Sequence, residues 1–160
     1  MKRMTTLFAL FMLALLVLAG CSTPANVEPG DDAGAGEEGA ELVDTHDELR
    51  AALEAAGLQV DQDDVLLDTF FPETTARFLE VNGAMIQTFE FADAAAAEAG
   101  AATVNATGTI IGNATIDWVD RPHFYQQGGL IVLYAGEDEA ILSALEGALG
   151  EPFVIGESSF

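Results

Sequence analysis

The chain has 160 residues, of which 27 are acidic and five are basic, so its formal net charge at pH 7 is −22. Nucleic-acid affinity depends largely on cationic contacts to phosphate, and this charge therefore excludes nucleic acid as a partner. The length suits a single domain with a modest core.

The first twenty-one residues have the order of an export signal. Lys2 and Arg3 precede the apolar run Leu7–Ala19, whose thirteen residues are too few to cross a bilayer, since a membrane-spanning helix needs about 20. The run ends at Leu18, Ala19, Gly20 and Cys21, and Cys21 is the only cysteine.

This tetrapeptide resembles the lipobox of bacterial lipoproteins, in which an aliphatic residue and two small residues precede a cysteine. The resemblance implies a signal peptide over residues 1–20, diacylglycerol on the sulfur of Cys21, and a further acyl chain such as palmitate on the new amino group. Two or more chains hold a protein stably to a membrane, whereas one holds it reversibly. The alternatives are an ordinary secretory signal with a chance cysteine, or an uncleaved anchor.

The resemblance also implies a location in the cell envelope, lipid-anchored and extracytoplasmic. Ser22, and not Asp, follows the cysteine, which implies the outer membrane in a cell with two membranes and otherwise the outer face of the cytoplasmic membrane. Cleavage removes Lys2 and Arg3 and leaves three arginines and no lysine against 27 acidic residues. Acidic surfaces poor in lysine resemble those of proteins from saline habitats.

Residues 21–43 are predicted to be a disordered acidic linker, because they are rich in Gly, Pro, Asp and Glu and contain few large apolar residues. The segment Gly34–Gly39 has a literal G-x-G-x-x-G spacing. It lacks the preceding strand and the following helix that a dinucleotide site requires, and it is interpreted as linker.

The folded domain is predicted over residues 44–155. Thr45 and Glu48 have the spacing of a capping box, which predicts a helix that ends at Gly57, with His46 facing solvent in its first turn. Residues 58–71 are less regular and are interpreted as a short strand or loop.

Asn82-Gly83 predicts a type I′ hairpin that pairs Val81 with Ala84 and Leu79 with Ile86. Asp93 is expected to cap an alanine-rich helix that ends near Val104.

The following segment is predicted to contain two strands and a helix. Residues 113–119 alternate as in a strand that Pro122 terminates, and residues 122–129 turn the chain. Leu130–Tyr134 is a continuous apolar run typical of a central buried strand. The last helix is expected to start near Glu137 and to end at Gly150.

Residues 77–104 and 113–149 thus share the order strand, strand, helix. The predicted fold is α+β, with two ββα units that form a four-stranded, mainly antiparallel sheet with helices on one face, preceded by one N-terminal helix and followed by a tail over residues 156–160. The succession Trp118-Val119, Pro122–Tyr125 and Leu130–Tyr134 is similar to that of small bacterial envelope lipoproteins without an assigned activity, and this resemblance bears on the fold only.

The chain offers few groups for catalysis, and no cofactor is expected. The expected lipid on the Cys21 sulfur leaves no cysteine to act as a nucleophile. The absence of lysine after cleavage rules out a P-loop or Schiff-base lysine. Asp61, Asp63 and Asp64 are a weak candidate for a calcium site, with a solvated acidic turn as the alternative. Zinc is not expected, because the two histidines have no H-E-x-x-H context.

The best remaining candidate is a patch for a ligand or a partner, made of Trp118, Arg121, His123, Phe124 and Tyr125. The alternative is that these residues belong to the core. The expected function is that of a monomeric, non-enzymatic, lipid-anchored domain that contacts the membrane through its lipid and another envelope protein through its surface, for interaction or structural upkeep. The alternatives are a binding module for a divalent cation or a small cationic ligand, and an enzyme of unrecognised type using His123.

Overall fold

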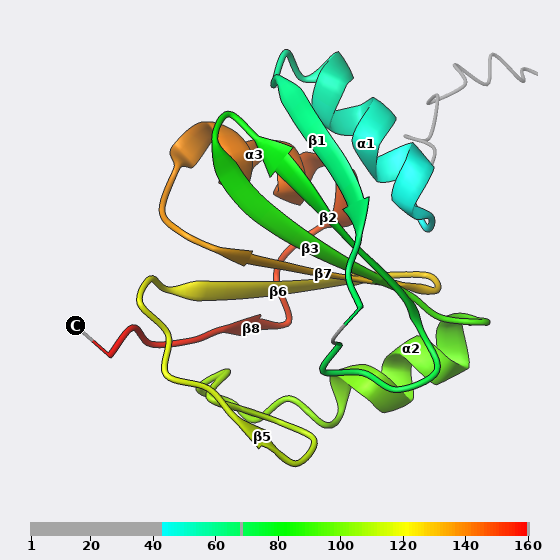
Figure 1. Ribbon diagram of the computed structural model, residues 1–160, viewed down its shortest axis with the longest axis vertical. Coiled ribbons are helices and arrows are strands. Elements are labelled where there is room, and N and C mark those ends of the chain that lie inside the picture. The colour runs from blue at the N-terminus through cyan, green and yellow to red at the C-terminus, as the bar shows by residue number, and fades with distance from the viewer. Residues whose placement is uncertain (1–42, 68, 160) are drawn as a thin grey trace, which may run out of the picture. The chain divides into compact units, whose positions relative to one another are not determined.

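The computed structural model describes residues 43–67 and 69–159, all of which belong to one compact unit, Gly36–Phe160 (Figure 1). The predicted signal peptide, which includes Leu18, Ala19 and Gly20, lies outside the described residues, as do the predicted lipid-attachment residue Cys21 and the linker up to residue 42. Among the helices of the described ranges, none has the length and apolarity required to cross a bilayer.

The elements follow one another as α1 His46–Ala55, β1 Val60–Val65, β2 Thr75–Val81, β3 Ala84–Glu90, α2 Ala94–Ala101, β4 Ile110–Ile111, β5 Ala114–Thr115, β6 Pro122–Gln127, β7 Leu130–Ala135, α3 Glu139–Leu149 and β8 Val154–Ile155. Six strands form one sheet in the order β1-β2-β3-β7-β6-β8, with every neighbouring pair antiparallel, and β4 and β5 form a second, two-stranded sheet. The predicted α+β class with a mainly antiparallel sheet is therefore confirmed.

The predicted count of four strands is wrong, because β1 adds to the outer edge of β2 and β8 to the outer edge of β6. The placement of all helices on one face is also wrong. Leu130, Val132 and Tyr134 of β7 pack in one core cluster with α1 and α3, whereas Ile131 and Leu133 pack in a second cluster with α2. A strand that is apolar at every position needs cover on both faces of its sheet.

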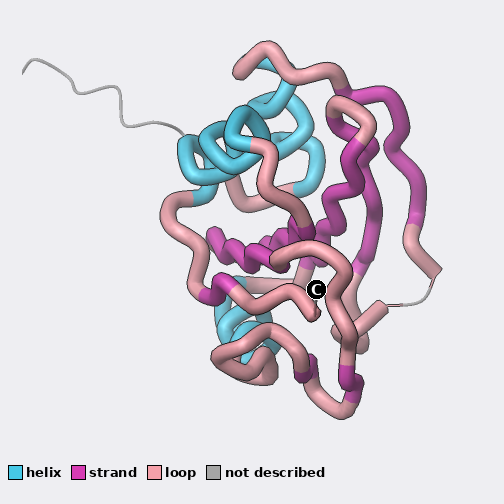
Figure 2. Tube along the Cα trace, turned by 90° about the vertical axis from the view of Figure 1, so that its left-hand side faces the viewer, coloured by secondary structure: helices cyan, strands magenta, loops and turns pink. Residues whose placement is uncertain are grey.

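The helices accordingly separate into two layers. Figure 2 shows two helices together on one side of the strands, and the third, α2, on its own. Since the strand pair β2–β3 is followed by a helix on one face and the pair β6–β7 by a helix on the other, the specific arrangement of two ββα units is not confirmed.

Local signals account for several of the element boundaries. Thr45 caps α1 in a full capping box with Glu48, as the sequence predicts. Asn82 and Gly83 have φ angles of 51° and 81°, which is the conformation that a type I′ turn requires, and the predicted pairs Leu79–Ile86 and Val81–Ala84 are formed.

The region around Pro122 differs from the prediction. Only Ala114 and Thr115 form a strand in the segment expected to be extended over residues 113–119, and Pro122 begins β6 where a turn was expected. Proline has no N–H to donate to a ladder, and the first residue of a strand is one of the few positions that tolerate it.

Both ends of the described domain are held by contacts. Val43 is buried in the cluster below α1 and α3, one residue before the predicted start of the domain. In the segment expected to be a tail, the Gly156 N–H donates to the Pro122 carbonyl and the Ser159 N–H to the Trp118 carbonyl. The contacts of the domain thus extend from Val43 to Ser159.

Candidate functional site

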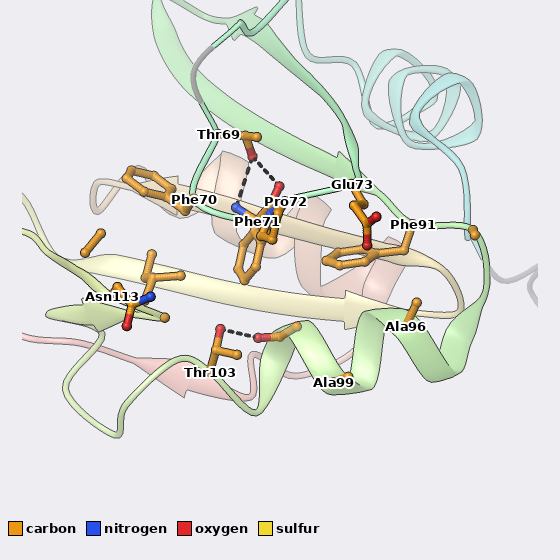
Figure 3. A pocket seen from close by; sticks show the side chains of 15 residues that line it. Thr69, Phe70, Phe71, Pro72, Glu73, Phe91, Ala96, Ala99, Thr103 and Asn113 are labelled. Atoms are coloured by element: carbon orange, nitrogen blue, oxygen red, sulfur yellow. Dashed lines mark hydrogen bonds between the residues drawn. The ribbon is translucent and has the colours of Figure 1, made fainter.

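An apolar cleft of about 830 Å³ lies on the α2 face of the sheet (Figure 3). Three segments form it: the loop of residues 69–73 that precedes β2, the helix α2 with Phe91 just before it, and the turn of residues 111–114 between β4 and β5. These segments are distant in sequence, and the sheet beneath them brings them together. We call this concavity the α2 cleft.

Phenylalanine rings form the floor of the α2 cleft. Phe70, Phe71 and Phe91 line it, and the centroid of the Phe71 ring lies 5.7 Å from that of Phe91 at an interplanar angle of 62°. On its other side Phe71 packs edge-on against Phe89, at 4.9 Å and 73°. Edge-to-face packing is a favoured geometry for aromatic pairs, and Phe71 is only 2% exposed, so the floor is well fixed.

The α2 wall of the cleft is made of small residues. A Cβ at Gly100 would lie 2.6 Å from Cζ and 2.8 Å from Cε1 of Phe91, so only glycine leaves room for this ring against the helix. Glycine inside a helix costs about 1 kcal/mol relative to alanine. The position of Phe91 thus accounts for a residue that weakens α2.

The loop opposite α2 is held by hydrogen bonds to a single backbone unit. The Thr69 hydroxyl accepts from the Phe71 N–H and donates to the Phe71 carbonyl, both at 3.1 Å, and the Thr74 hydroxyl donates to the same carbonyl at 2.9 Å. Glu73 follows with φ 61°, in the left-handed region. For a residue other than glycine this conformation costs about 1–2 kcal/mol.

Among the described residues, Glu73 is the only charged one that lines the α2 cleft. Within residues 43–67 and 69–159 its carboxylate has no ion pair or hydrogen-bond partner. The hydroxyl of Thr103 donates to the Gly100 carbonyl at 2.7 Å and is already satisfied. In Figure 3 Glu73 and Phe91 lie at one end of the cleft and Asn113 at the other. The cleft therefore combines an aromatic floor with one uncompensated charge.

The five residues of the predicted patch do not share one surface. Trp118 and Phe124 pack edge-on at 6.1 Å in the α2-side cluster, and the Trp118 Nε1–H donates to the Gly108 carbonyl at 2.7 Å. Tyr125 belongs to the opposite cluster, because successive residues of β6 point to opposite faces. Arg121 is half-exposed and lies 3.8 Å from the Glu137 carboxylate.

His123 is also a packed side chain, 7% exposed and stacked on Tyr134 with ring centroids 6.3 Å apart. Burial lowers the pKa of His123, the charge of Arg121 lowers it further, and a backbone hydrogen bond at Gly136 with the charges of Glu137 and Glu146 opposes these effects only in part. The Nε2 atom of His123 and the hydroxyl of Tyr125 are buried, and neither has a hydrogen-bond partner among the residues that the structure describes. Burial, more than the nearby charges, raises the pKa of Tyr125 to about 12.

Asp63 lies at the centre of a charged network that joins α1 to the sheet. Its Oδ1 atom is 3.0 Å from His46 Nε2 and 2.6 Å from Arg77 Nη2, and its Oδ2 atom is 3.3 Å from Arg50 Nη1. The Nδ1 atom of His46 lies 2.8 Å from the Thr88 hydroxyl. His46 is 3% exposed, so the prediction of a solvent-facing His46 is wrong.

The environment of Asp63 favours the ionised carboxylate. Burial on its own raises the pKa of Asp63, but the hydrogen bonds from His46 and Arg77, together with their charges, outweigh burial and lower the pKa below its ordinary value. Thr88, His46 and Asp63 have the order of a nucleophile triad. Thr88 is completely buried, however, so a substrate cannot reach its hydroxyl, and the network holds α1 to the sheet.

The three carboxylates of the calcium candidate do not converge. Asp63 is bound by the groups named above, and Asp61 accepts from Gln59 Nε2 at 2.6 Å. Asp63 and Asp64 are adjacent in β1, and adjacent strand residues point to opposite faces. The described residues contain no group of three His, Cys, Asp or Glu side chains that could hold a metal ion.

Comparison with known proteins leaves the geometry of the domain as the guide to its function. No protein-family model matches the chain, and neither a curated protein nor a solved structure matches it.

The residues of the α2 cleft were not among the site residues predicted from the sequence. The signals for them were faint: the Phe70-Phe71-Pro72 run in an irregular segment, and Gly100 in an otherwise alanine-rich helix. A glycine inside a helical pattern can indicate close approach of another group, and here that group is the ring of Phe91.

Proposed function

We propose that this protein is a non-enzymatic binding domain, held at the outer face of a membrane by lipid on Cys21, and that the α2 cleft takes an apolar small-molecule ligand. The observation that carries the binding role is the cleft of about 830 Å³ with its floor of Phe70, Phe71 and Phe91. Sites for small ligands usually have volumes of about 300–1,000 Å³, mostly apolar linings and few polar groups. The α2 cleft has each of these properties.

The chemistry of the lining supports binding without reaction. General acid–base or covalent catalysis needs a reactive group and a second group that activates it within hydrogen-bond reach. Of the described residues that line the α2 cleft, Glu73 is the single titratable one. Asp63 and His123 have shifted pKa values and side chains of the kinds used in catalysis, but neither lines the cleft. Asp63 is held in ion pairs, and His123 is packed against Tyr134.

The lipid anchor rests on the lipobox resemblance of residues 18–21. A flexible linker of the length between Ser22 and Val43 would give the domain a root-mean-square reach of about 26 Å from the membrane. Mass spectrometry of the native protein tests the anchor. We expect a chain that begins at Cys21 and carries fatty-acid mass there, and a chain with another first residue or without that mass would contradict the proposal.

Equilibrium binding of Nile red, a neutral apolar dye, to the full-length protein in nanodiscs of zwitterionic lipid tests the cleft. Ala99 lines the α2 cleft, and Ala99→Trp fills it, whereas Ala95 is exposed on the same helix and does not line the cleft. We expect Ala99→Trp to weaken dye binding about tenfold, the cost of overpacking a fitted site. The matched variant Ala95→Trp should bind as the wild type does.

Dye that dissolves in the lipid contributes equally to all three proteins, so only the difference between the variants is interpreted. Equal binding by the wild type and both variants would contradict a binding role for the α2 cleft. Equal loss in both variants would show that a tryptophan on α2 disturbs the helix, and this too would contradict the proposal.

A further inference from the structure

We infer that the ligand of the α2 cleft is a hydrophobic cation, meaning a small molecule in which an aromatic or branched apolar group carries an ammonium. This inference rests on the proposed binding function and names the chemical class of the ligand. Three features of the cleft lead to it: its charge, its aromatic floor and the backbone of Glu73.

The charge of the cleft is negative and uncompensated. Glu73 lines the cleft without an ion pair or hydrogen bond to a described residue, and the lining residues that the structure describes include no arginine, lysine or histidine. The three arginines of the described residues are engaged elsewhere, since Arg50 and Arg77 contact Asp63 and Arg121 contacts Glu137. The Glu73 carboxylate would attract a cationic group of a ligand, and no described side chain of the lining competes with that group for the carboxylate.

The aromatic floor suits the same ligand. Figure 3 shows the Glu73 carboxylate and the Phe91 ring at the same end of the cleft. An ammonium over the face of an aromatic ring is attracted by the negative face of the ring, and the attraction is stronger when water is excluded. The remaining rings, Phe70 and Phe71, offer apolar surface for the rest of the ligand. Carboxylate, ring and apolar floor together match a cation attached to a hydrophobic group.

The backbone of Glu73 is the third feature. Its φ of 61° lies in a region that glycine occupies without strain, and a glutamate there retains a strained conformation. Strained residues concentrate at binding sites, where the surrounding structure holds them in place. In this loop, the hydrogen bonds of Thr69 and Thr74 to Phe71 provide that support. Glutamate at this position places a carboxylate in the cleft, whereas glycine would relieve the strain but would supply no charge.

The charge of the chain also separates this ligand from other occupants. A second copy of the chain would bring another formal charge of −22 against the first, so self-association through an acidic cleft is opposed. An anionic ligand meets the same repulsion, whereas a cation is attracted over a distance of about one Debye length.

The experiment compares three ligands of nearly equal shape by calorimetric titration of the full-length protein in zwitterionic nanodiscs: 2-naphthylmethylammonium, the neutral 2-naphthylmethanol and the anion 2-naphthoate. We expect the ammonium to bind about five- to tenfold more tightly than the alcohol, from one carboxylate contact and one cation–π contact. The anion should bind more weakly than both. Empty nanodiscs give the correction for partition into lipid.

Two variants separate the site from the overall charge of the protein. Glu73→Gln removes the carboxylate of the cleft, and Glu98→Gln removes one from the exposed side of α2, where it does not line the cleft. We expect Glu73→Gln to lower the affinity for the ammonium to that for the alcohol. The affinity for the alcohol should not change. Glu98→Gln should keep the preference for the cation.

The outcomes distinguish this inference from the proposed function. If ammonium and alcohol bind equally and Ala99→Trp weakens both, the cleft binds ligands but the preference for a cation is refuted. If none of the three ligands binds, the proposed function fails with it. An equal effect of Glu73→Gln and Glu98→Gln, or an affinity that falls as protein concentration rises because a second copy fills the cleft, would also overturn the inference.

Discussion

At the scale of single residues, Asp63 links α1 to the sheet through charged contacts. It lies on β1 and receives contacts from His46 and Arg50 of α1 and from Arg77 of β2. His46 in turn reaches Thr88 of β3. Because His46 is buried, loss of the Asp63 carboxylate would leave a buried ring nitrogen without its partner, which costs more than the loss of an exposed ion pair.

We predict that Asp63→Asn lowers the free energy of unfolding by about 1–3 kcal/mol at pH 7. The pKa of Asp63 is lowered in the folded state, so its stabilising effect is complete above the unfolded pKa of about 4 and is lost as the pH falls through the folded value. The difference between wild type and variant should therefore shrink below about pH 4. Urea denaturation at several pH values measures it.

Asp61→Asn is the matched control, because Asp61 lies on the same strand, is exposed and bonds only the Gln59 amide among the described residues. It should change the stability at pH 7 by little. A stability difference between wild type and Asp63→Asn that stays constant from pH 7 to pH 3 would show that the ion pairs are not its cause.

At the scale of elements, the sequence predicted those whose signals are local. The capping box of α1, the Asn82-Gly83 turn and the apolar strand β7 each depend on a few adjacent residues, and each is present in the structure. The end of α2 was predicted less well, since the helix stops at Ala101 and not near Val104.

The features that were missed depend on contacts between distant residues. His46 is buried because Asp63 and Thr88, 17 and 42 positions further along the chain, close over it. The sequence predicts that Pro122 ends a strand, but Pro122 begins β6 and pairs with Ala135 of β7. The α2 cleft likewise joins three segments that no local pattern relates. Spacing along the chain does not encode these pairings.

The helix α2 gives a prediction at this scale. Replacing Gly100 by alanine should add about 1 kcal/mol of helix propensity, but the new Cβ meets the Phe91 ring, and overpacking of this kind costs about 1–3 kcal/mol. We therefore expect Gly100→Ala to give no gain in stability and to weaken Nile red binding, as Phe91 is displaced toward the cleft. Thermal unfolding and dye titration measure the two effects.

Gly147 of α3 is the control, because a Cβ there meets no atom within 4 Å. Gly147→Ala should stabilise the protein by about 1 kcal/mol and leave dye binding unchanged. If Gly100→Ala stabilised the protein as much as Gly147→Ala and bound dye as well as the wild type, the role assigned to Gly100 would be wrong.

At the scale of the whole molecule, an acidic surface surrounds a sheet that is covered on both faces. The chain carries 27 acidic residues against five basic ones, and the described arginines are already paired with carboxylates. The remaining carboxylates repel one another in the folded state more than in the expanded unfolded chain. Folding stability should therefore depend on the ions in solution.

We predict that the thermal unfolding midpoint rises from dilute buffer to about 1 M NaCl, where the Debye length falls to about 3 Å and the repulsion is screened. Differential scanning calorimetry across this range measures the midpoint. A midpoint that stays flat or falls would reject self-repulsion as a main determinant of stability.

The central claim is that the α2 cleft is the ligand site, and amide chemical-shift mapping tests it most directly. The ¹⁵N-labelled full-length protein in zwitterionic nanodiscs is titrated with 2-naphthylmethylammonium. We predict that the largest shifts occur in residues 69–73, 91–103 and 111–114, which surround the cleft. Shifts concentrated in the alanine-lined groove between α1 and α3, or no saturable shifts in the described domain, would contradict the claim.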